Sequence, residues 1–131
     1  MTNDPEETTR LTFSAPERRD DGDTVTFEFT TQIPETLRWF SGHFDSNPVL
    51  PAMVQLREAL SLVRSTWPDL HSLRRITRAK FHARIRPSET LRLRLSRVGR
   101  SGKAGFEYMR ETEMCSSGVL EFATREVSEF E

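Results

Sequence analysis

His43 is the residue in this sequence whose type and surroundings most clearly suggest chemistry. It lies in the segment WFSGHFDSNPVLPAMVQLREAL, residues 39–60, between a glycine and a phenylalanine and ahead of a predicted helix. An imidazole has an unperturbed pKa of about 6.5, so it can accept or donate a proton near neutral pH. The segment favours a general base at position 43, although a histidine that only holds the loop by a hydrogen bond fits the same residues.

The residues after His43 predict an irregular loop that leads into a helix. Pro48 and Pro51 favour turns and extended backbone just before them, because the residue before a proline is pushed out of the α region. Pro51 also suits the first position of a helix, where its missing N–H is no loss. Helical spacing then continues over 52–66 and ends at Trp67, which precedes a further proline.

One face of this helix is predicted to be buried. At 100° per residue, the apolar residues that share this face are Met53, Leu56, Ala59, Leu60 and Val63. The polar residues that fall largely outside it are Gln55, Glu58 and Ser61. Arg57 lies near the edge of the face. Glu58 is therefore expected to be a solvent-facing charge, unless the first helical turn is irregular and shifts the phase.

Strands are predicted on both sides of the helix from the alternation of apolar and polar residues. Before it, residues 11–17 and 23–31 are expected to form a hairpin around the turn signal Asp21-Gly22. After it, the predicted strand segments are 73–86, 91–95, 104–111 and 114–124. The apolar sides of the first two segments hold Ala79, Phe81, Ala83, Ile85, Leu91, Leu93 and Leu95.

This order of elements predicts an α+β fold, in which one long helix packs against a curved antiparallel sheet of about six strands. Residues 1–10 are polar and acidic and are expected to form a flexible tail. Residues 11–131 are expected to form a single domain, because the chain is short enough for one core. The sheet has to curve around the helix to cover it.

Composition narrows the class of protein. No apolar run is long enough for a membrane span, and the acidic N-terminus shows no secretory signal. The single cysteine, Cys115, rules out an internal disulfide and fits the reducing cytoplasm. The three histidines and this cysteine lack the spacing of a zinc site, so we expect no metal.

The charge is segregated, although the net charge is only −1. Residues 74–103 contain eleven Lys or Arg residues and one acid, whereas residues 1–30 contain eight acids and three arginines. The basic middle predicts either a solvated sheet face or a docking surface for an anionic partner. Nucleic acid is not expected, because only His82 interrupts the basic face and interleaved aromatic residues for stacking are absent.

The order of elements and the loop motif together resemble the hotdog fold. FSGHFDSNPVLPAMVQL, residues 40–56, resembles the active-site segment of the 3-hydroxyacyl-acyl carrier protein dehydratases of fatty acid synthesis. The matching residues are Phe40, Gly42, His43, Phe44, Pro48, Val49, Leu50 and Pro51. PVLPAMVQL is most similar to the branch found in aryl polyene pigment clusters. KFHARIRPSETLRLRL and FEYMRETEMCSSGVLEF are similar to later segments of that branch, in the same order.

The resemblance implies removal of water from a 3-hydroxyacyl thioester to give a trans-2-enoyl thioester. It implies a homodimer joined edge to edge, without a dissociable cofactor or metal. A heterodimer with another hotdog subunit is the alternative, for which Arg57 is the reason. The substrate arrives on the phosphopantetheine arm of an acyl carrier protein, or as acyl-CoA. By the same resemblance His43 is the catalytic base, the backbone N–H of Ala52 binds the thioester oxygen, and the loop is supported by Gly42, Phe44 and Pro51.

The family's catalytic acid is replaced in this sequence. The family has Glu or Asp fourteen residues after the histidine, and here that position is Arg57. Arginine keeps its proton at neutral pH, so it cannot act as that acid. The adjacent Glu58 lies about 100° further around the helix and takes over only if the helix phase shifts. Arg57 is a surface residue, a hydrogen-bond donor to the substrate hydroxyl, or the mark of a subunit that binds acyl thioesters without dehydrating them.

Three functions stay open. The first is a 3-hydroxyacyl-thioester dehydratase with His43 as its base. The second is a non-catalytic or accessory hotdog subunit that binds an acyl carrier protein or a partner hotdog protein, for which Arg57 is the motive. The third, ranked lower, is an acyl-thioester hydrolase, which needs a helix carboxylate such as Glu58 to activate water.

Overall fold

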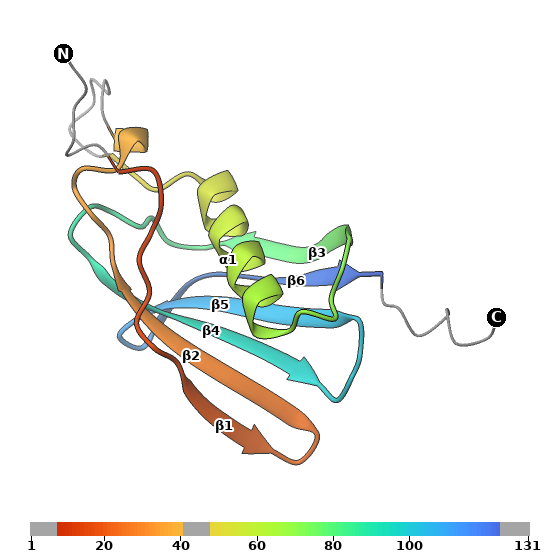
Figure 1. Cartoon of the computed structure of the whole chain (residues 1–131). Coiled ribbons are helices and arrows are strands. Elements are labelled where there is room, and N and C mark those ends of the chain that lie inside the picture. Colours follow the sequence, from red (N-terminus) through yellow and green to blue (C-terminus); the bar gives the residue numbers. More distant parts are fainter. Residues whose placement is uncertain (1–7, 41–47, 124–131) are drawn as a thin grey trace.

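The computed structural model describes residues 8–40 and 48–123. Six antiparallel strands form one sheet in the order β1-β2-β4-β5-β6-β3, and one long helix lies across one face of it (Figure 1). The elements are β1 (Glu17–Asp21), β2 (Thr24–Gln32), the short 3₁₀ helix η1 (Arg38–Phe40), α1 (Ala52–Thr66), β3 (Leu73–Phe81), β4 (Thr90–Val98), β5 (Lys103–Arg110) and β6 (Glu113–Phe122). The predicted α+β arrangement is confirmed.

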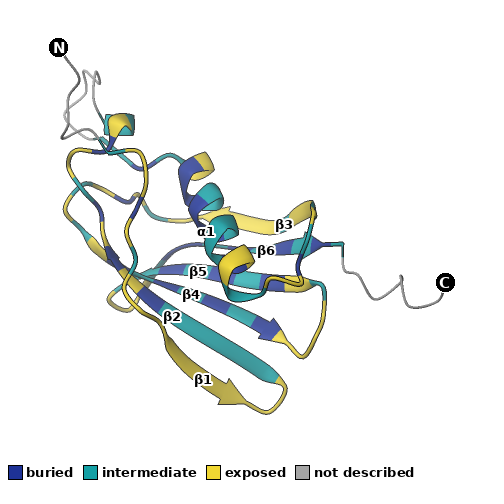
Figure 2. Cartoon of the chain, in the orientation of Figure 1, coloured by how far each residue is buried: buried dark blue, intermediate teal, exposed yellow. Residues whose placement is uncertain are grey.

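The core lies between α1 and the helix-facing side of the sheet (Figure 2). Leu91, Leu93 and Leu95 of β4 are fully buried, whereas the arginines between them point to the other face. This is the alternation that the sequence predicts for a sheet with one buried side. Burial declines toward the two edge strands, and every residue of β1 is exposed.

Helix α1 has the predicted ends. Pro51 precedes it in extended backbone, at φ −63° and ψ 149°, and Trp67 ends it by donating its N–H to Val63 O at 2.8 Å. The predicted buried face is correct at Ala59 and Val63 but wrong in the first part of the helix. The buried residues are Val54, Gln55, Glu58, Ala59 and Val63, whereas Met53 is 74% exposed. Polar residues occupy part of the core-facing side because other segments supply partners for them there.

The N-terminal hairpin forms with a different first strand from the predicted one. The turn is Gly22-Asp23, because Asp21 pairs with Thr24, and Gly22 takes the positive φ of 62° that such a tight turn needs. This register pairs 17–21 with β2, so the strand is the stretch predicted as the connection. The apolar stretch before it packs elsewhere: the Phe13 ring meets Phe29 edge to face at 6.2 Å.

The strand predicted over 73–86 ends at Phe81. Arg78 has a positive φ of 56°, and the register with β6 shifts between Thr77 and Lys80, so a bulge interrupts the alternation there. The next residues leave the sheet, and Ile85 is fully buried against the core. Phe81, predicted to point inward to the core, is 41% exposed because β3 is the last strand of the sheet.

Candidate functional site

The loop with the predicted catalytic base lies outside the described residues. Gly42, His43 and Phe44 belong to this part of the chain, so their predicted roles stay predictions. The described residues on either side are η1, which ends at Phe40, and the segment from Pro48 into α1. The described part of the candidate site therefore consists of the helix start and the polar residues around it.

The first backbone N–H groups of α1 have no side-chain cap within the described part of the chain. Pro51 makes no side-chain cap, and the first turn contains no acidic residue. Val54 and Gln55 donate their N–H groups to Pro51 O at 3.1 and 3.2 Å. The N–H groups of Ala52 and Met53 have no acceptor within the helix, as is general for the first helical positions. An oxygen that gains negative charge is stabilised at such a place by these groups and the helix dipole.

A neutral network holds this helix start against the sheet. We call Gln55, Tyr108 and Ser116 the Gln55 cluster. The Gln55 side-chain amide donates to Leu50 O at 3.1 Å, and Ser116 Oγ donates to Gln55 Oε1 at 2.7 Å. Tyr108 donates its hydroxyl to Gln55 O at 2.8 Å. All three residues are buried, so strands β5 and β6 fix both the first turn of α1 and the residue just before Pro51.

Burial determines the state of the Tyr108 hydroxyl. Tyr108 is fully buried, and this burial raises its pKa far above the ordinary value of about 10, with the negative charge of Glu58 adding to the effect. The phenol therefore remains a hydrogen-bond donor to the helix.

A charged network lies one turn further along the helix. We call Arg10, Arg57 and Glu58 the Glu58 cluster. Glu58 Oε2 accepts from Arg10 Nε at 2.8 Å and from Arg57 at 2.7 Å, and Oε1 accepts from Arg10 at 3.4 Å. The Glu58 side chain is only 3% exposed, whereas those of Arg10 and Arg57 are 54% and 40% exposed. The expectation of a solvent-facing charge at Glu58 is therefore wrong.

Arg57 connects this cluster to the N-terminal segment and to η1. It donates to Thr9 O at 2.8 Å, and its guanidinium carbon lies 5.6 Å from the centre of the Trp39 ring, within cation–π range. Residues 8–10, predicted as part of a flexible tail, thus contact the fold, and Thr8 N–H also donates to Thr36 O at 2.9 Å. Arg57 is therefore tethered by contacts to Glu58, Thr9 and Trp39.

The Glu58 cluster and the helix start differ in which polar groups are available to a substrate. Both carboxylate oxygens of Glu58 accept hydrogen bonds from guanidinium groups, and the side chain is only 3% exposed, so little of it is accessible to a substrate. Hydrogen bonding to Glu58 raises the pKa of Arg10, which keeps that partner charged. The helix start at Ala52, in contrast, has no side-chain cap among the described residues.

Residues of both clusters were missed by the sequence reasoning as site residues: Arg10, Gln55, Tyr108 and Ser116. Three of them, Gln55, Tyr108 and Ser116, lie in segments that carry the family resemblance, and that was the available signal. Arg10 has no such signal, because its partner Glu58 is 48 residues away.

Other chemistry has little support in the described ranges. They contain no group of three or more His, Cys, Asp or Glu residues arranged to hold a metal ion. No helix among them is long and apolar enough to cross a membrane. Cys115 is buried, and this burial raises the pKa of its thiol, which is the opposite of what a nucleophilic cysteine requires.

Comparison with known proteins identifies the family. The sequence model of the ApeI-like family, described as ApeI dehydratase, matches residues 5–119. No curated protein matches the sequence. A solved structure of an uncharacterised protein from Erwinia carotovora subsp. atroseptica shares 24% identity and a TM-score of 0.70, over 87% of this chain and 96% of that one.

A second solved structure has a similar fold. The dehydratase heterocomplex ApeI:P from Xenorhabdus doucetiae has a TM-score of 0.72 and 21% identity, over 89% of this chain and 100% of that one. At these identities the two structures show a common fold, which confirms the predicted hotdog arrangement. Because the family match spans most of its length, the chain belongs to the ApeI-like dehydratases, a hotdog-fold family.

Proposed function

We propose that this chain is a 3-hydroxyacyl-thioester dehydratase subunit, which forms a trans-2-enoyl thioester on an acyl carrier protein. The observation that carries the proposal is the uncapped start of α1, where the resemblance predicts the N–H that binds the thioester oxygen. Acyl-CoA is the alternative form of the substrate. The phosphopantetheine arm belongs to the substrate carrier, and the reaction needs no further cofactor.

In the proposed reaction His43 takes the C2 proton. The Ala52 N–H stabilises the charge that develops on the thioester oxygen. The bond from C3 to the hydroxyl then breaks, and the imidazolium of His43 gives its proton to the departing hydroxide, so water leaves. Glu58 has no part in this step, because its oxygens are engaged by Arg10 and Arg57.

The test is turnover of a 3-hydroxyacyl carrier protein, followed by mass spectrometry of the acyl group. The unchanged chain should form the enoyl product, and His43→Ala should lower the rate at least about 100-fold, as expected for loss of a general base. His82→Ala is the matched control, because His82 is exposed and lies just after β3. Equal rates in the chain and His43→Ala would exclude this role, and free acid as the product would indicate a hydrolase.

A second candidate is a non-catalytic hotdog subunit that completes a heteromeric enzyme. The observation that favours it is Arg57 at the position of the family's acid, bound to Glu58 and Thr9. This candidate predicts no product from the chain alone, and activity after mixing with a catalytic hotdog subunit. Arg57→Glu is the further probe: a gain of turnover in the isolated chain would mean that the substitution at position 57 is what removed activity.

The proposal includes a second hotdog subunit joined edge to edge. The solved relative from Xenorhabdus doucetiae is a heterocomplex, which makes a non-identical partner as reasonable for this chain as a second copy. Sedimentation of the purified chain, alone and with a co-expressed hotdog partner, separates the two assemblies.

A further inference from the structure

A hollow lies along α1, on the side where the helix meets the N-terminal segment. Its volume is ≈ 420 Å³, which is within the range of small-molecule sites. The residues that line it are Arg10, Arg57, Leu60, Ser61, Arg64 and Ser65. All of them except Arg10 lie at helical spacing along one side of α1. The lining therefore contains cations, hydroxyl groups and one apolar side chain, but no acid.

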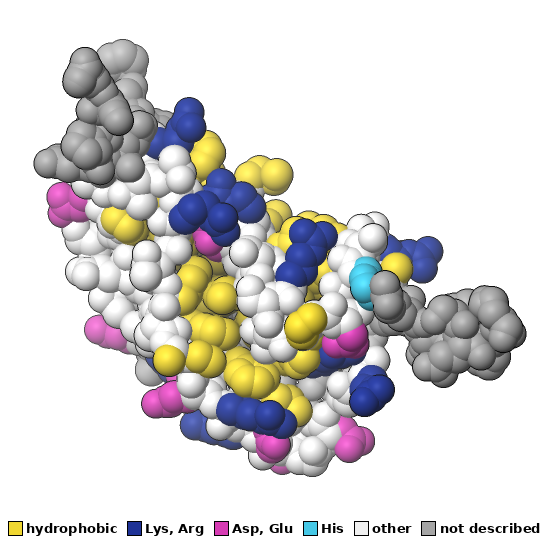
Figure 3. Space-filling model, in the orientation of Figure 1, with side chains coloured by type: hydrophobic (Ala, Val, Ile, Leu, Met, Phe, Trp, Pro, Cys, Tyr) yellow, Lys and Arg dark blue, Asp and Glu magenta, His cyan; other side chains and the backbone are white. Residues whose placement is uncertain are grey.

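The hollow has an excess of positive charge. Within the described ranges the only carboxylate that contacts its arginines is Glu58, which binds Arg10 at 2.8 Å and Arg57 at 2.7 Å. Arg64 is exposed and has no ion pair in this part of the chain. Three guanidinium groups against one carboxylate leave a net charge of +2. Figure 3 shows Lys and Arg side chains over α1, beside an open apolar area.

Two of the three guanidinium groups are held in place. Arg10 donates to both oxygens of Glu58, through Nε at 2.8 Å and Nη2 at 3.4 Å. Arg57 Nη2 donates to Glu58 and to Thr9 O. The guanidinium group of Arg57 also lies against the Trp39 ring. Because these contacts already order both side chains, a ligand does not have to order them again on binding.

Donor groups at the hollow remain available for a ligand. A guanidinium group has five N–H donors, and Nη1 of both Arg10 and Arg57 makes no hydrogen bond in the described part of the chain. Arg64 has no hydrogen bond there either. The Ser65 hydroxyl donates to Ser61 O at 3.1 Å and can still accept. The hollow thus offers donors without a matching negative acceptor.

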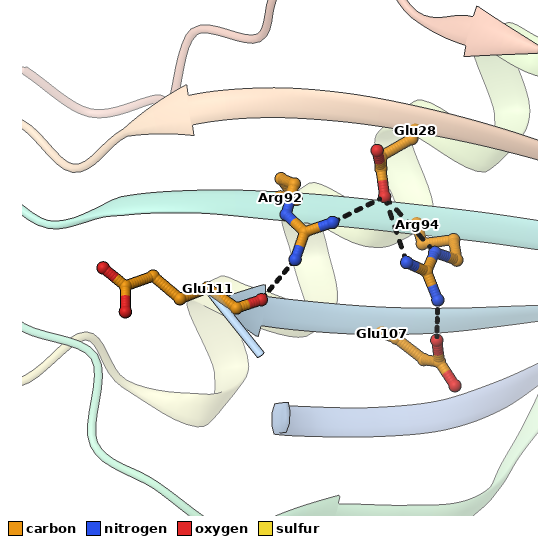
Figure 4. A network of polar contacts seen from close by, with 5 residues as sticks. All are labelled: Glu28, Arg92, Arg94, Glu107 and Glu111. Carbon is orange, nitrogen blue, oxygen red and sulfur yellow. Dashed lines mark hydrogen bonds and ion pairs between the residues drawn. The ribbon is translucent and has the colours of Figure 1, made fainter. Parts of the chain in front are cut away.

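Arginines on the outer face of the sheet provide a contrast. Arg92 and Arg94 bind Glu28 at 3.2 Å, and Arg94 also binds Glu107 at 3.4 Å (Figure 4). Two carboxylates balance two guanidinium groups in this network. It is electrically complete without a ligand, whereas the hollow on α1 lacks the negative charge that would complete it.

The chemistry of the hollow fits a phosphate monoester. Near neutral pH such a group has close to two negative charges, which match the net charge of the hollow. Guanidinium groups bind phosphate oxygens through paired, charge-assisted hydrogen bonds. The volume leaves room for the organic part of an ester, which Leu60 can contact.

We propose that the hollow on α1 binds an organic phosphate monoester between Arg10, Arg57 and Arg64. Two sources have this chemistry: a free phosphate ester, and the 3′-phosphate of coenzyme A when the substrate is acyl-CoA. The inference goes beyond the proposed function and does not depend on it, because the proposed reaction uses none of the residues that line the hollow.

Calorimetry with phenyl phosphate, in a buffer free of phosphate and sulfate, tests the site. Arg64→Gln should weaken binding at least about 10-fold through loss of charge-assisted hydrogen bonds, and Arg64 has no contact whose loss would disturb the fold. Arg100→Gln is the matched control, because Arg100 is exposed outside the hollow, and it should leave the affinity unchanged. The proposal is wrong if no saturable binding occurs at millimolar concentration, or if Arg64→Gln binds as tightly as the unchanged chain.

Glu58→Gln separates a built site from simple attraction between charges. The change raises the net charge of the hollow but releases Arg10 and Arg57 from the carboxylate that holds them. A site made of held arginines predicts weaker binding of phenyl phosphate, and tighter binding would overturn the proposal. Circular dichroism checks that each variant is folded, and Arg64→Gln remains decisive if Glu58→Gln does not fold.

Coenzyme A and its 3′-dephospho form distinguish the two sources. Binding of coenzyme A that is at least about 10-fold tighter, with the advantage lost in Arg64→Gln, assigns the site to the 3′-phosphate. Equal affinity for both forms, with phenyl phosphate still bound, assigns it to a free ester. No substrate is turned over in these measurements, so failure of this site and failure of the dehydratase proposal are distinguished.

Discussion

The Gln55 cluster and the Glu58 cluster lie one turn apart on α1 and solve the burial of polar groups differently. Gln55, Tyr108 and Ser116 are neutral, buried and bonded to one another and to Leu50. Glu58 is equally buried, but its partners Arg10 and Arg57 are about half exposed. The first arrangement depends on enclosed hydrogen bonds, and the second on charges that water can reach.

The two clusters also connect different parts of the candidate site to the rest of the fold. The Gln55 cluster joins the helix start, with its open N–H groups, to β5 and β6. The Glu58 cluster joins the helix to residues 9–10, and through the Trp39 contact to η1. When a buried hydrogen bond is lost, the remaining partner cannot bond to water instead. A half-exposed arginine that loses its partner can be hydrated. The neutral cluster should therefore matter more for stability.

The largest effect is expected for Gln55→Leu. It removes the bonds to Leu50 O and from Ser116 Oγ, and both partners are left buried and unpaired. The free energy of unfolding should fall by about 3 kcal/mol, measured by urea denaturation. Gln32→Leu, at an exposed position of β2, is the control and should change it by less than about 0.5 kcal/mol. Similar losses of unfolding free energy in Gln55→Leu and Gln32→Leu would mean that the burial of the Gln55 hydrogen bonds does not cause the loss.

Glu58→Gln should have the second largest effect. The change keeps the size of the side chain but takes the carboxylate away from Arg10 and Arg57. We expect a loss of about 2 kcal/mol, below the range for fully buried pairs because both arginines are partly exposed. The loss should decrease in high salt, unlike that of Gln55→Leu. Glu107→Gln is the control, because Glu107 is half-exposed on the outer face of the sheet. If Glu58→Gln lowers the free energy of unfolding no more than Glu107→Gln does, the burial of Glu58 does not matter for stability.

Tyr108→Phe should cost about 1 kcal/mol near neutral pH, through the lost bond to Gln55 O. The pKa of Tyr108 is raised on folding, so its contribution is complete below the unfolded value of about 10 and is lost as pH rises above it. The unchanged chain should lose more stability than Tyr108→Phe as the pH rises above about 10.

Tyr108 is the only tyrosine, so ultraviolet absorbance of tyrosinate reports its ionisation directly. In the folded protein the signal should rise only as the chain unfolds. A titration near pH 10 without unfolding would show that the cluster is open to water.

The smallest effect is expected for Arg10→Ala. The Arg10 side chain is 54% exposed, and exposed ion pairs contribute little, so the loss should be about 0.5 kcal/mol. A double-mutant cycle with Glu58→Gln measures the coupling between the two side chains. A coupling energy above about 2 kcal/mol would mean that the Glu58 cluster contributes as much to stability as the Gln55 cluster does.

Prediction from the sequence succeeded where the signal was local. Pro51 and Trp67 mark the helix ends because proline and the turn after it act on neighbouring residues. The leucines of β4 predict a half-buried strand because alternation needs only the strand itself. The strand predicted over 73–86 was too long, because the bulge at Arg78 depends on pairing with β6.

The buried face of α1 could not be predicted in the same way. Hydrophobic periodicity places every polar side chain outward, but Gln55 and Glu58 are buried because they find partners there. Those partners lie 61 residues away at Ser116 and 48 residues away at Arg10.

The sequence by itself determined the family, the helix and most of the strands. Only the tertiary structure decided that Glu58 is enclosed by two arginines, and that β3 is an edge strand of the sheet. The physical reason is distance along the chain. Helix ends and alternation arise between neighbours, whereas the burial of a charge and the exposure of an edge depend on which remote segments arrive beside it.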